Sequence, residues 1–102
     1  MDNDRVLGAV SLCRRAGKLA LGFDNAVNAI QRGTWLVLLA QDASERTARN
    51  IRAMCGEATP VVALGRTQEQ IEMATGRKFA VAAVCDENFA RLISQKIREE
   101  AQ

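Results

Sequence analysis

The stretch Trp35-Leu-Val-Leu-Leu-Ala40 is an unbroken apolar run with the length of a single strand. Continuous apolar runs of this length are typical of strands whose sheet is covered on both faces. Asp42 follows and can cap a helix with Glu45 three residues later, and Gly56 would end that helix. The stretch therefore predicts a central strand that leads directly into a helix.

The same alternation continues toward the C-terminus. The segment Pro60–Leu64 predicts a strand, and Thr67 with Gln70 resembles a capping box that opens a short helix. The segment Phe79–Cys85 predicts the next strand, after which Asp86 caps a final helix.

The alternation also extends toward the N-terminus. Asn3 or Asp4 can cap a first helix, which Gly17 ends. The segment Leu19–Leu21 is short and flanked by glycines, which favours an edge strand. A second helix follows and ends at Gly33. Its apolar residues at helical spacing are Phe23, Ala26, Val27 and Ile30.

Alternating strands and helices indicate a sheet with helices on both faces. We therefore expect an α/β fold, a three-layer αβα sandwich around a central, mostly parallel or mixed sheet of about four strands. The chain has 102 residues, 48% of them hydrophobic, and no linker or repeat interrupts it. Residues 1–102 are therefore predicted to form a single domain with its own core.

The composition of the chain limits the classes of function that we expect. No apolar run is long enough to span a bilayer, and the first residues do not resemble a secretory signal, so we expect a soluble cytoplasmic protein. Histidine is absent, and Cys13, Cys55 and Cys85 form no paired-cysteine motif. This predicts buried, reduced thiols and no metal or cofactor. The net charge of +2 is too small to indicate nucleic-acid binding by itself, so the placement of the charges must decide.

A basic stretch separates the first two predicted helices. It reads Arg14-Arg15-Ala16-Gly17-Lys18, and Gly22 stands just before the second helix. A helix N-terminus attracts anions through its unpaired N–H groups, so the expected partner is a polyanion with a folded backbone. Asn25, Asn28 and Arg32 belong to the same helix and form a polar surface that can contact bases or sugar hydroxyls.

Two further basic segments are candidates for contact with an anionic ligand. Gly76-Arg77-Lys78 forms a tight turn before a predicted strand, and loops on a rigid scaffold often contact ligands. Arg46, Arg49 and Arg52 recur every three residues on the third predicted helix. Such a stripe is typical of a solvated face, although phosphate contact is the alternative.

Cys85 and Arg91 bracket five residues, which is the spacing of the cysteine phosphatases. A phosphate-binding loop needs bare backbone N–H groups, whereas Asp86 and Glu87 would repel the dianion here. A cysteine enzyme is therefore the disfavoured alternative.

Several short pieces match a known family in order and spacing. They are Arg15-Ala16-Gly17-Lys18 with Gly22, Leu38 to Ser44, Ala74-Thr75-Gly76, and Val84-Cys85-Asp86 with Phe89-Ala90. Over essentially its whole length the chain resembles the ribosomal L-seven-Ae family, in particular its small bacterial YlxQ-like members. The resemblance implies an αβα sandwich that binds structured RNA, typically a kink-turn, without catalytic activity.

Carried over position by position, the resemblance implies a site on the second helix and on the loop before the last strand. In archaeal members a Gly-x-Asn-Glu-x-x-Lys pattern opens that helix, and here Gly22 matches while Asp24, Asn25 and Asn28 replace the three polar residues. The implied RNA-binding residues are Arg15, Lys18, Gly22, Asp24, Asn25, Asn28, Arg32, Gly76, Arg77, Lys78 and Phe79. The replacements favour phosphate positioning over base reading.

The expected partner is therefore a structured RNA, either ribosomal or kink-turn-like. Because Asn28 replaces lysine while Arg77 and Lys78 add charge to the loop, another RNA fold is an open possibility. The alternative is a protein-interaction module of the translation apparatus with a degraded RNA site, which Asp24 and Asn28 favour.

Overall fold

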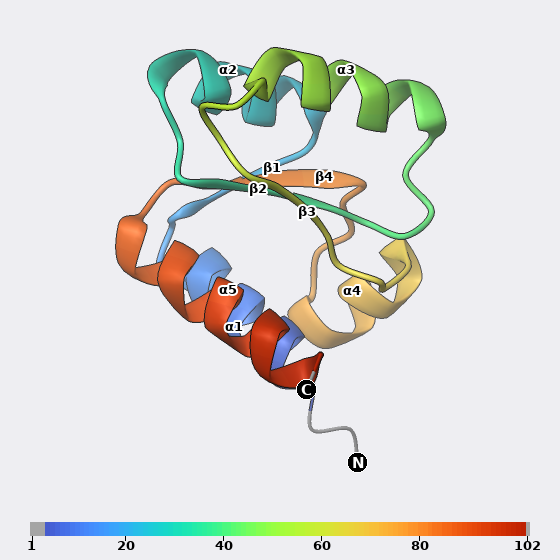
Figure 1. The fold of residues 1–102 in the computed structure, drawn as a ribbon. Helices are drawn as coiled ribbons and strands as arrows, with labels where there is room; N and C mark the ends of the chain where they lie inside the picture. Colours follow the sequence, from blue (N-terminus) through green and yellow to red (C-terminus); the bar gives the residue numbers. More distant parts are fainter. Residues whose placement is uncertain (1–3, 102) are drawn as a thin grey trace.

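The computed structural model describes residues 4–101. Its elements are α1 (Arg5–Arg15), β1 (Leu19–Leu21), α2 (Phe23–Arg32), β2 (Leu36–Leu39), α3 (Glu45–Cys55), β3 (Val61–Ala63), α4 (Gln68–Thr75), β4 (Val81–Val84) and α5 (Glu87–Glu100). Helices α2 and α3 cover one face of the sheet, and α1, α4 and α5 cover the other (Figure 1). The predicted αβα sandwich is confirmed.

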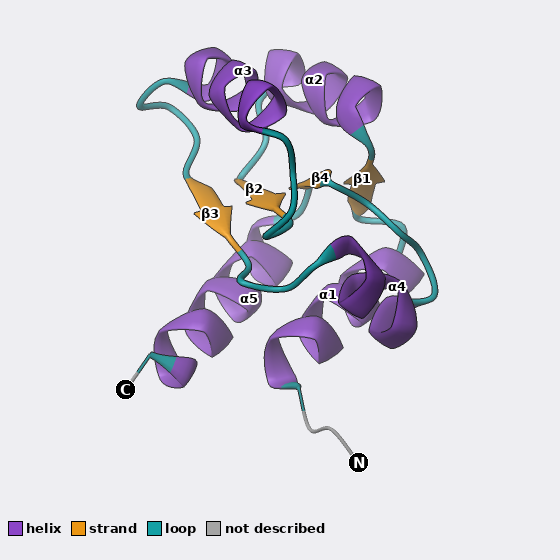
Figure 2. Ribbon diagram, turned by 90° about the vertical axis from the view of Figure 1, so that its right-hand side faces the viewer, coloured by secondary structure: helices purple, strands orange, loops and turns teal. Residues whose placement is uncertain are grey.

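The sheet is mixed, with the strand order β1-β4-β2-β3 (Figure 2). Strand β2 pairs in parallel with β3 and antiparallel with β4, and β4 pairs antiparallel with β1. The prediction that Leu19–Leu21 forms an edge strand is confirmed. Since β1 and β2 run in the same direction, α2 returns over the sheet from the end of β1 to the start of β2.

Strand β2 explains why the central apolar run is unbroken. Leu36 and Leu38 pack into the core cluster beneath α1 and α5, whereas Val37 and Leu39 pack into the cluster beneath α2 and α3. Successive side chains of a strand point to opposite faces, so a strand covered on both sides needs apolar residues at every position. Burial of each such side chain contributes about 1.5–3 kcal/mol.

The helix starts confirm most of the predicted caps. The Asp4 carboxylate accepts from the Leu7 N–H at 3.0 Å, and Thr67 with Gln70 forms the predicted capping box. Asp86 caps α5 by accepting from the Phe89 N–H at 3.0 Å. Asn3, the other candidate for the first cap, lies outside the described residues.

The predicted cap of α3 is wrong. Ser44, not Asp42, accepts from the Thr47 N–H, because a turn that the Ala43 N–H closes on the Ala40 carbonyl delays the helix. Asp42 instead accepts from the backbone N–H of Gln68 at 3.0 Å, so it binds the first turn of α4.

A cluster of charges joins the two ends of the described chain. The Arg66 guanidinium bonds to Asp4 at the start of α1 and to Glu100 at the end of α5, with N–O distances of 2.9 Å to each. It also donates to the Leu64 carbonyl at 2.8 Å. Burial alone would raise the pKa of Asp4, but hydrogen bonds from Arg66 and Leu7 and the Arg66 charge lower it. We refer to Asp4, Arg66 and Glu100 as the Arg66 cluster.

No helix among residues 4–101 is both long enough and apolar enough to cross a membrane.

Candidate nucleic-acid interface

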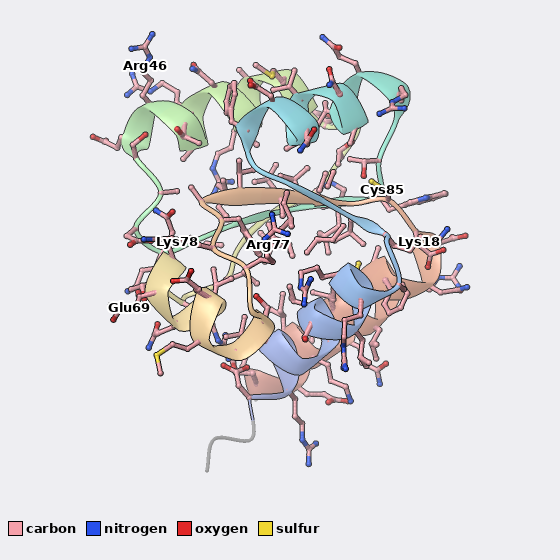
Figure 3. All side chains as sticks on the ribbon, turned by 180° about the vertical axis from the view of Figure 1, so that it is seen from behind. Lys18, Arg46, Glu69, Arg77, Lys78 and Cys85 are labelled. Carbon is pink, nitrogen blue, oxygen red and sulfur yellow. The ribbon has the colours of Figure 1, made fainter. Side chains whose placement is uncertain are left out.

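The residues predicted to bind RNA lie on elements that adjoin the edge strand β1, namely the end of α1, helix α2 and the loop before β4. Among residues 4–101, β1 pairs with β4 on one side only. At its start the Lys18 carbonyl accepts from the Cys85 N–H at 2.8 Å, and at its end the Gly22 N–H donates to the Val81 carbonyl at 2.9 Å. Strand rise puts about 13 Å between Lys18 and Gly22, and Figure 3 faces this edge.

The start of β1 is basic. Arg15, Lys18 and Arg32 are all exposed there. Arg32 ends α2 and reaches this end because α2 returns toward the start of β2, where the Thr34 hydroxyl donates to the Val84 carbonyl at 2.6 Å. We call Arg15, Lys18 and Arg32 the basic end.

The end of β1 gathers the other candidates. Gly22, Asp24 and Asn25 open α2 there. The loop Gly76-Arg77-Lys78 lies near them because it leads into Val81, the hydrogen-bond partner of Gly22. In Figure 3, Lys18 lies at one end of β1, with Arg77 and Lys78 displaced toward the other. The structure thus divides the predicted site between two ends of one strand.

Gly22 leaves the start of α2 open. Its φ of +91° and ψ of 167° lie in a region that side chains avoid, and no atom lies within 4 Å of the position a Cβ would occupy. As the N-cap it supplies no side-chain hydrogen bond to the first turn of α2. The first N–H groups of α2 therefore remain available to an anion.

The polar residues that follow Gly22 differ in whether their side chains are hydrogen-bonded within the protein. The Asn25 amide nitrogen donates to the Leu21 carbonyl at 2.8 Å, so it fastens the turn between β1 and α2 and leaves its oxygen to accept. The side chains of Asp24 and Asn28 are exposed one turn apart on the same face of α2. The Asp24 carboxylate is not the N-cap of α2, so capping does not explain it.

The loop after α4 is held by two residues that the predicted site omitted. The Thr75 side chain, only 3% exposed, has its hydroxyl 2.7 Å from the Ile71 carbonyl and accepts from the Arg77 N–H at 3.3 Å. Arg14 donates through Nε to the Thr75 carbonyl at 2.9 Å. Thr75 belongs to the motif Ala74-Thr75-Gly76, so the sequence could have indicated its role. The hydrogen bond between Arg14 and Thr75 joins distant parts of the chain, and no local sequence pattern indicates it.

Within this loop, Arg77 and Lys78 are exposed but Phe79 is not. Phe79 is 3% exposed and belongs to the core cluster with α1 and α5. Its side chain therefore anchors the loop, and only the neighbouring Arg77 and Lys78 side chains of this loop segment are exposed to an external partner.

The cations of this region are not neutralised by neighbouring carboxylates. They are Arg14, Arg15, Lys18, Arg32, Arg77 and Lys78. In the part of the chain that the structure describes, the side-chain ion pairs involve only Arg66, Arg91 and Lys96 as cations. Five of these cations are exposed and free to contact an anionic partner, whereas Arg14 is half-buried and donates through Nε to the Thr75 carbonyl. We refer to the six cations, together with Gly22, Asp24, Asn25, Asn28 and Gly76, as the β1 surface.

The cysteines only partly follow the prediction. Cys13 and Cys55 are buried as expected, but Cys85 is exposed, because the chain leaves the sheet one residue before it. Burial raises the pKa of Cys13 to about 12, and the charge of Asp86 adds to the shift. The Asp86 carboxylate occupies the start of α5, where a phosphatase loop would bind its phosphate.

The cysteines do not gather with other metal-binding side chains either. Within residues 4–101, no group of three His, Cys, Asp or Glu side chains is placed to hold a metal ion.

Comparison with known proteins gives a family and a fold. The model described as the ribosomal protein L7Ae/L30e/S12e/Gadd45 family matches residues 4–92. A solved protein with unknown function from Bacillus halodurans is 28% identical, with a TM-score of 0.86 over 94% of this chain and 99% of that one. A 15.5kD RNA binding protein from Giardia lamblia is 15% identical, with a TM-score of 0.70 over 99% of this chain and 98% of that one. No curated protein matches the chain.

Proposed function

Because the chain belongs to the ribosomal protein L7Ae/L30e/S12e/Gadd45 family, we propose that it is a non-catalytic protein that binds structured RNA through the β1 surface. The observation that carries the proposal is the set of cations without ion pairs at the two ends of β1, together with the open N-terminus of α2. Phosphate contacts supply most of the affinity of proteins for nucleic acids, and unpaired lysines and arginines provide them.

The two ends of β1 have different roles in this proposal. The basic end and the loop with Arg77 and Lys78 hold phosphates on either side of a bend in the RNA. The free N–H groups after Gly22 bind a phosphate or a base edge between them. The Asn25 oxygen and the Asn28 amide contact bases or sugar hydroxyls, which distinguish RNA from DNA.

The preferred RNA in this proposal is a kink-turn or a ribosomal RNA element of similar shape, and the protein acts in the cytoplasm as part of a ribonucleoprotein. A bent RNA fits because the cations lie toward both ends of β1, and the two ends of this strand are about 13 Å apart. Asp24, Asn25 and Asn28 replace the three polar residues of the family pattern, so in this proposal RNA shape decides binding more than sequence does.

The test is the double variant Lys18→Ala/Arg32→Ala, with binding to a kink-turn RNA measured by filter binding over a salt series. We expect an affinity loss of about 2 kcal/mol, roughly 30-fold, since each lost contact is worth about 1 kcal/mol. The slope of log affinity against log salt should fall by about 2. The matched control Arg46→Ala/Arg49→Ala removes two exposed arginines from α3 and should change neither quantity. Unchanged affinity and slope in the first variant would refute the proposal.

A protein-interaction module is the second candidate, and one observation favours it. The Asp24 carboxylate stays exposed beside the start of α2, and the amide nitrogen of Asn25 is committed to Leu21, which weakens this surface as an RNA site. This candidate predicts equal affinity for a kink-turn RNA and for a plain duplex.

A further inference from the structure

A groove of about 490 Å³ lies between Trp35 and one side of α5. The α5 residues that line it include Glu87, Arg91, Ser94 and Arg98, which recur at helical spacing and so form one stripe along the helix. The groove shares no lining residue with the β1 surface, and neither the core nor the proposed RNA contacts require it.

Trp35 is an exposed aromatic side chain on a fixed backbone. It was expected within the central strand, but β2 begins one residue later and Trp35 is 51% exposed. Its N–H donates to the Val84 carbonyl at 3.2 Å, and the Thr34 hydroxyl donates to the same carbonyl at 2.6 Å. A planar ring is thus presented outward from a rigid support, which limits the entropy lost when a flat ligand packs against it.

The wall opposite Trp35 is polar and carries a free cation. Arg91 is paired with Glu87 at 3.0 Å, so these two charges compensate each other. Arg98 is exposed and has no ion pair within residues 4–101. Ser94 adds a hydroxyl between them. An aromatic face opposite a free guanidinium matches the two parts of a nucleotide, because bases stack on aromatic rings and phosphates bind arginine.

The groove is continuous with the basic end of the β1 surface. In the sheet, Leu19 and Leu36 both pair with Val84 from opposite sides. Lys18 and Trp35 precede these two residues, so they lie in one row on either side of Cys85. Two strand spacings put their backbones about 10 Å apart. An RNA strand that leaves Lys18 therefore reaches Trp35 across the end of the sheet.

We propose that this groove is a stacking subsite for an unpaired nucleotide that flanks the structured RNA, with its base on Trp35 and its phosphate on Arg98. The subsite rests on the proposed function, because the structured part of the RNA occupies the β1 surface. It accepts any base, since every base has a stacking face.

Trp35 itself reports on the subsite. The chain has one tryptophan and no tyrosine, so its intrinsic fluorescence comes from Trp35. The probes are a blunt kink-turn RNA and the same RNA with a short unpaired extension at its 5′ or 3′ end. We expect one extension to quench Trp35 and to raise affinity about tenfold over the blunt RNA.

Variants separate stacking from structural effects. Trp35→Ala should abolish the advantage of the extended RNA and leave binding of the blunt RNA unchanged, whereas Trp35→Phe should retain most of it. Arg98→Ala should lower the salt slope for the extended RNA only. Arg46→Ala, which removes an exposed arginine of α3, should behave like the wild type in both assays.

Failure of the subsite and failure of the proposed function give different results. If the blunt RNA binds but no extension adds quenching or affinity, the subsite is overturned and RNA binding by the β1 surface stands. If the blunt RNA does not bind but a single-stranded oligonucleotide alone quenches Trp35, the proposed function fails and the groove remains a nucleotide site. Absence of both signals overturns both.

Discussion

The Arg66 cluster and the β1 surface use the same kind of side chain in opposite ways. The Arg66 side chain is 14% exposed and has two carboxylates and a carbonyl as partners. Lys18, Arg77 and Lys78 are exposed and have no ion pair within residues 4–101. Positive charge in this fold therefore stabilises structure where it is paired and is available to a partner where it is unpaired.

The largest expected effect is the loss of stability in Arg66→Ala. Removal of the guanidinium leaves Asp4 without its ionic partner, so we expect the free energy of unfolding to fall by about 2–3 kcal/mol in urea denaturation. RNA affinity should be unchanged. The matched variant Arg77→Ala should alter stability by less than about 0.5 kcal/mol and should weaken RNA binding. If Arg66→Ala weakened RNA binding without loss of stability, and Arg77→Ala lowered stability without loss of RNA binding, the different roles assigned to the two regions would be contradicted.

A loss of about 2 kcal/mol in stability is expected for Gly22→Ala, because a side chain there must adopt an unfavourable backbone conformation. The control is Gly8→Ala in the middle of α1, where φ is not positive and a Cβ would meet nothing within 4 Å. That variant should gain about 0.5–1 kcal/mol from helix propensity. Equal effects of the two substitutions would argue against a strained start of α2.

The Arg66 cluster should also make stability depend on pH below neutrality. Its partners lower the pKa of Asp4, so the contribution of Asp4 is present above its unfolded pKa of about 3.9 and is lost as pH falls through the folded value. Asp4→Asn should be less stable at neutral pH and should lose less stability than the wild type between about pH 5 and pH 3, because the contribution of Asp4 is already absent. Thermal unfolding across this range measures both effects, and an unchanged acid dependence would exclude Asp4 as its source.

The smallest expected effect is a tightening of RNA binding in Asp24→Asn. Its carboxylate is exposed beside the start of α2, where it repels phosphates at a cost of about 0.5–1 kcal/mol. The variant should bind the kink-turn RNA a few-fold more tightly, by roughly two- to fivefold. Weaker binding would instead mean that Asp24 accepts a hydrogen bond from a base.

Local patterns predicted the parts of this molecule that local interactions fix. The apolar run of β2, the edge strand Leu19–Leu21 and the capping box at Thr67 each depend on residues a few positions apart. The cap at Ser44 was missed because a turn closed by Ala43 intervenes. Predictions from spacing therefore hold where a single element decides the geometry.

The contacts that organise the candidate site and the Arg66 cluster are long-range and have no local signature. Arg14 and Thr75 are 61 positions apart, and Arg66 and Asp4 are 62 apart. The burial of Phe79 and the exposure of Trp35 likewise depend on where neighbouring strands end. The resemblance of short motifs indicated the β1 surface as a region, whereas only the fold separates its two ends and adds the positioning residues.

The most direct test of the central claim is the affinity of the intact protein for a kink-turn RNA relative to a plain RNA duplex of equal length, measured at several salt concentrations. Unpaired cations at both ends of β1 predict tighter binding of the kink-turn at every salt concentration and a steep decline of affinity with salt. Equal affinity for the two RNAs would contradict recognition of a bent RNA by the β1 surface.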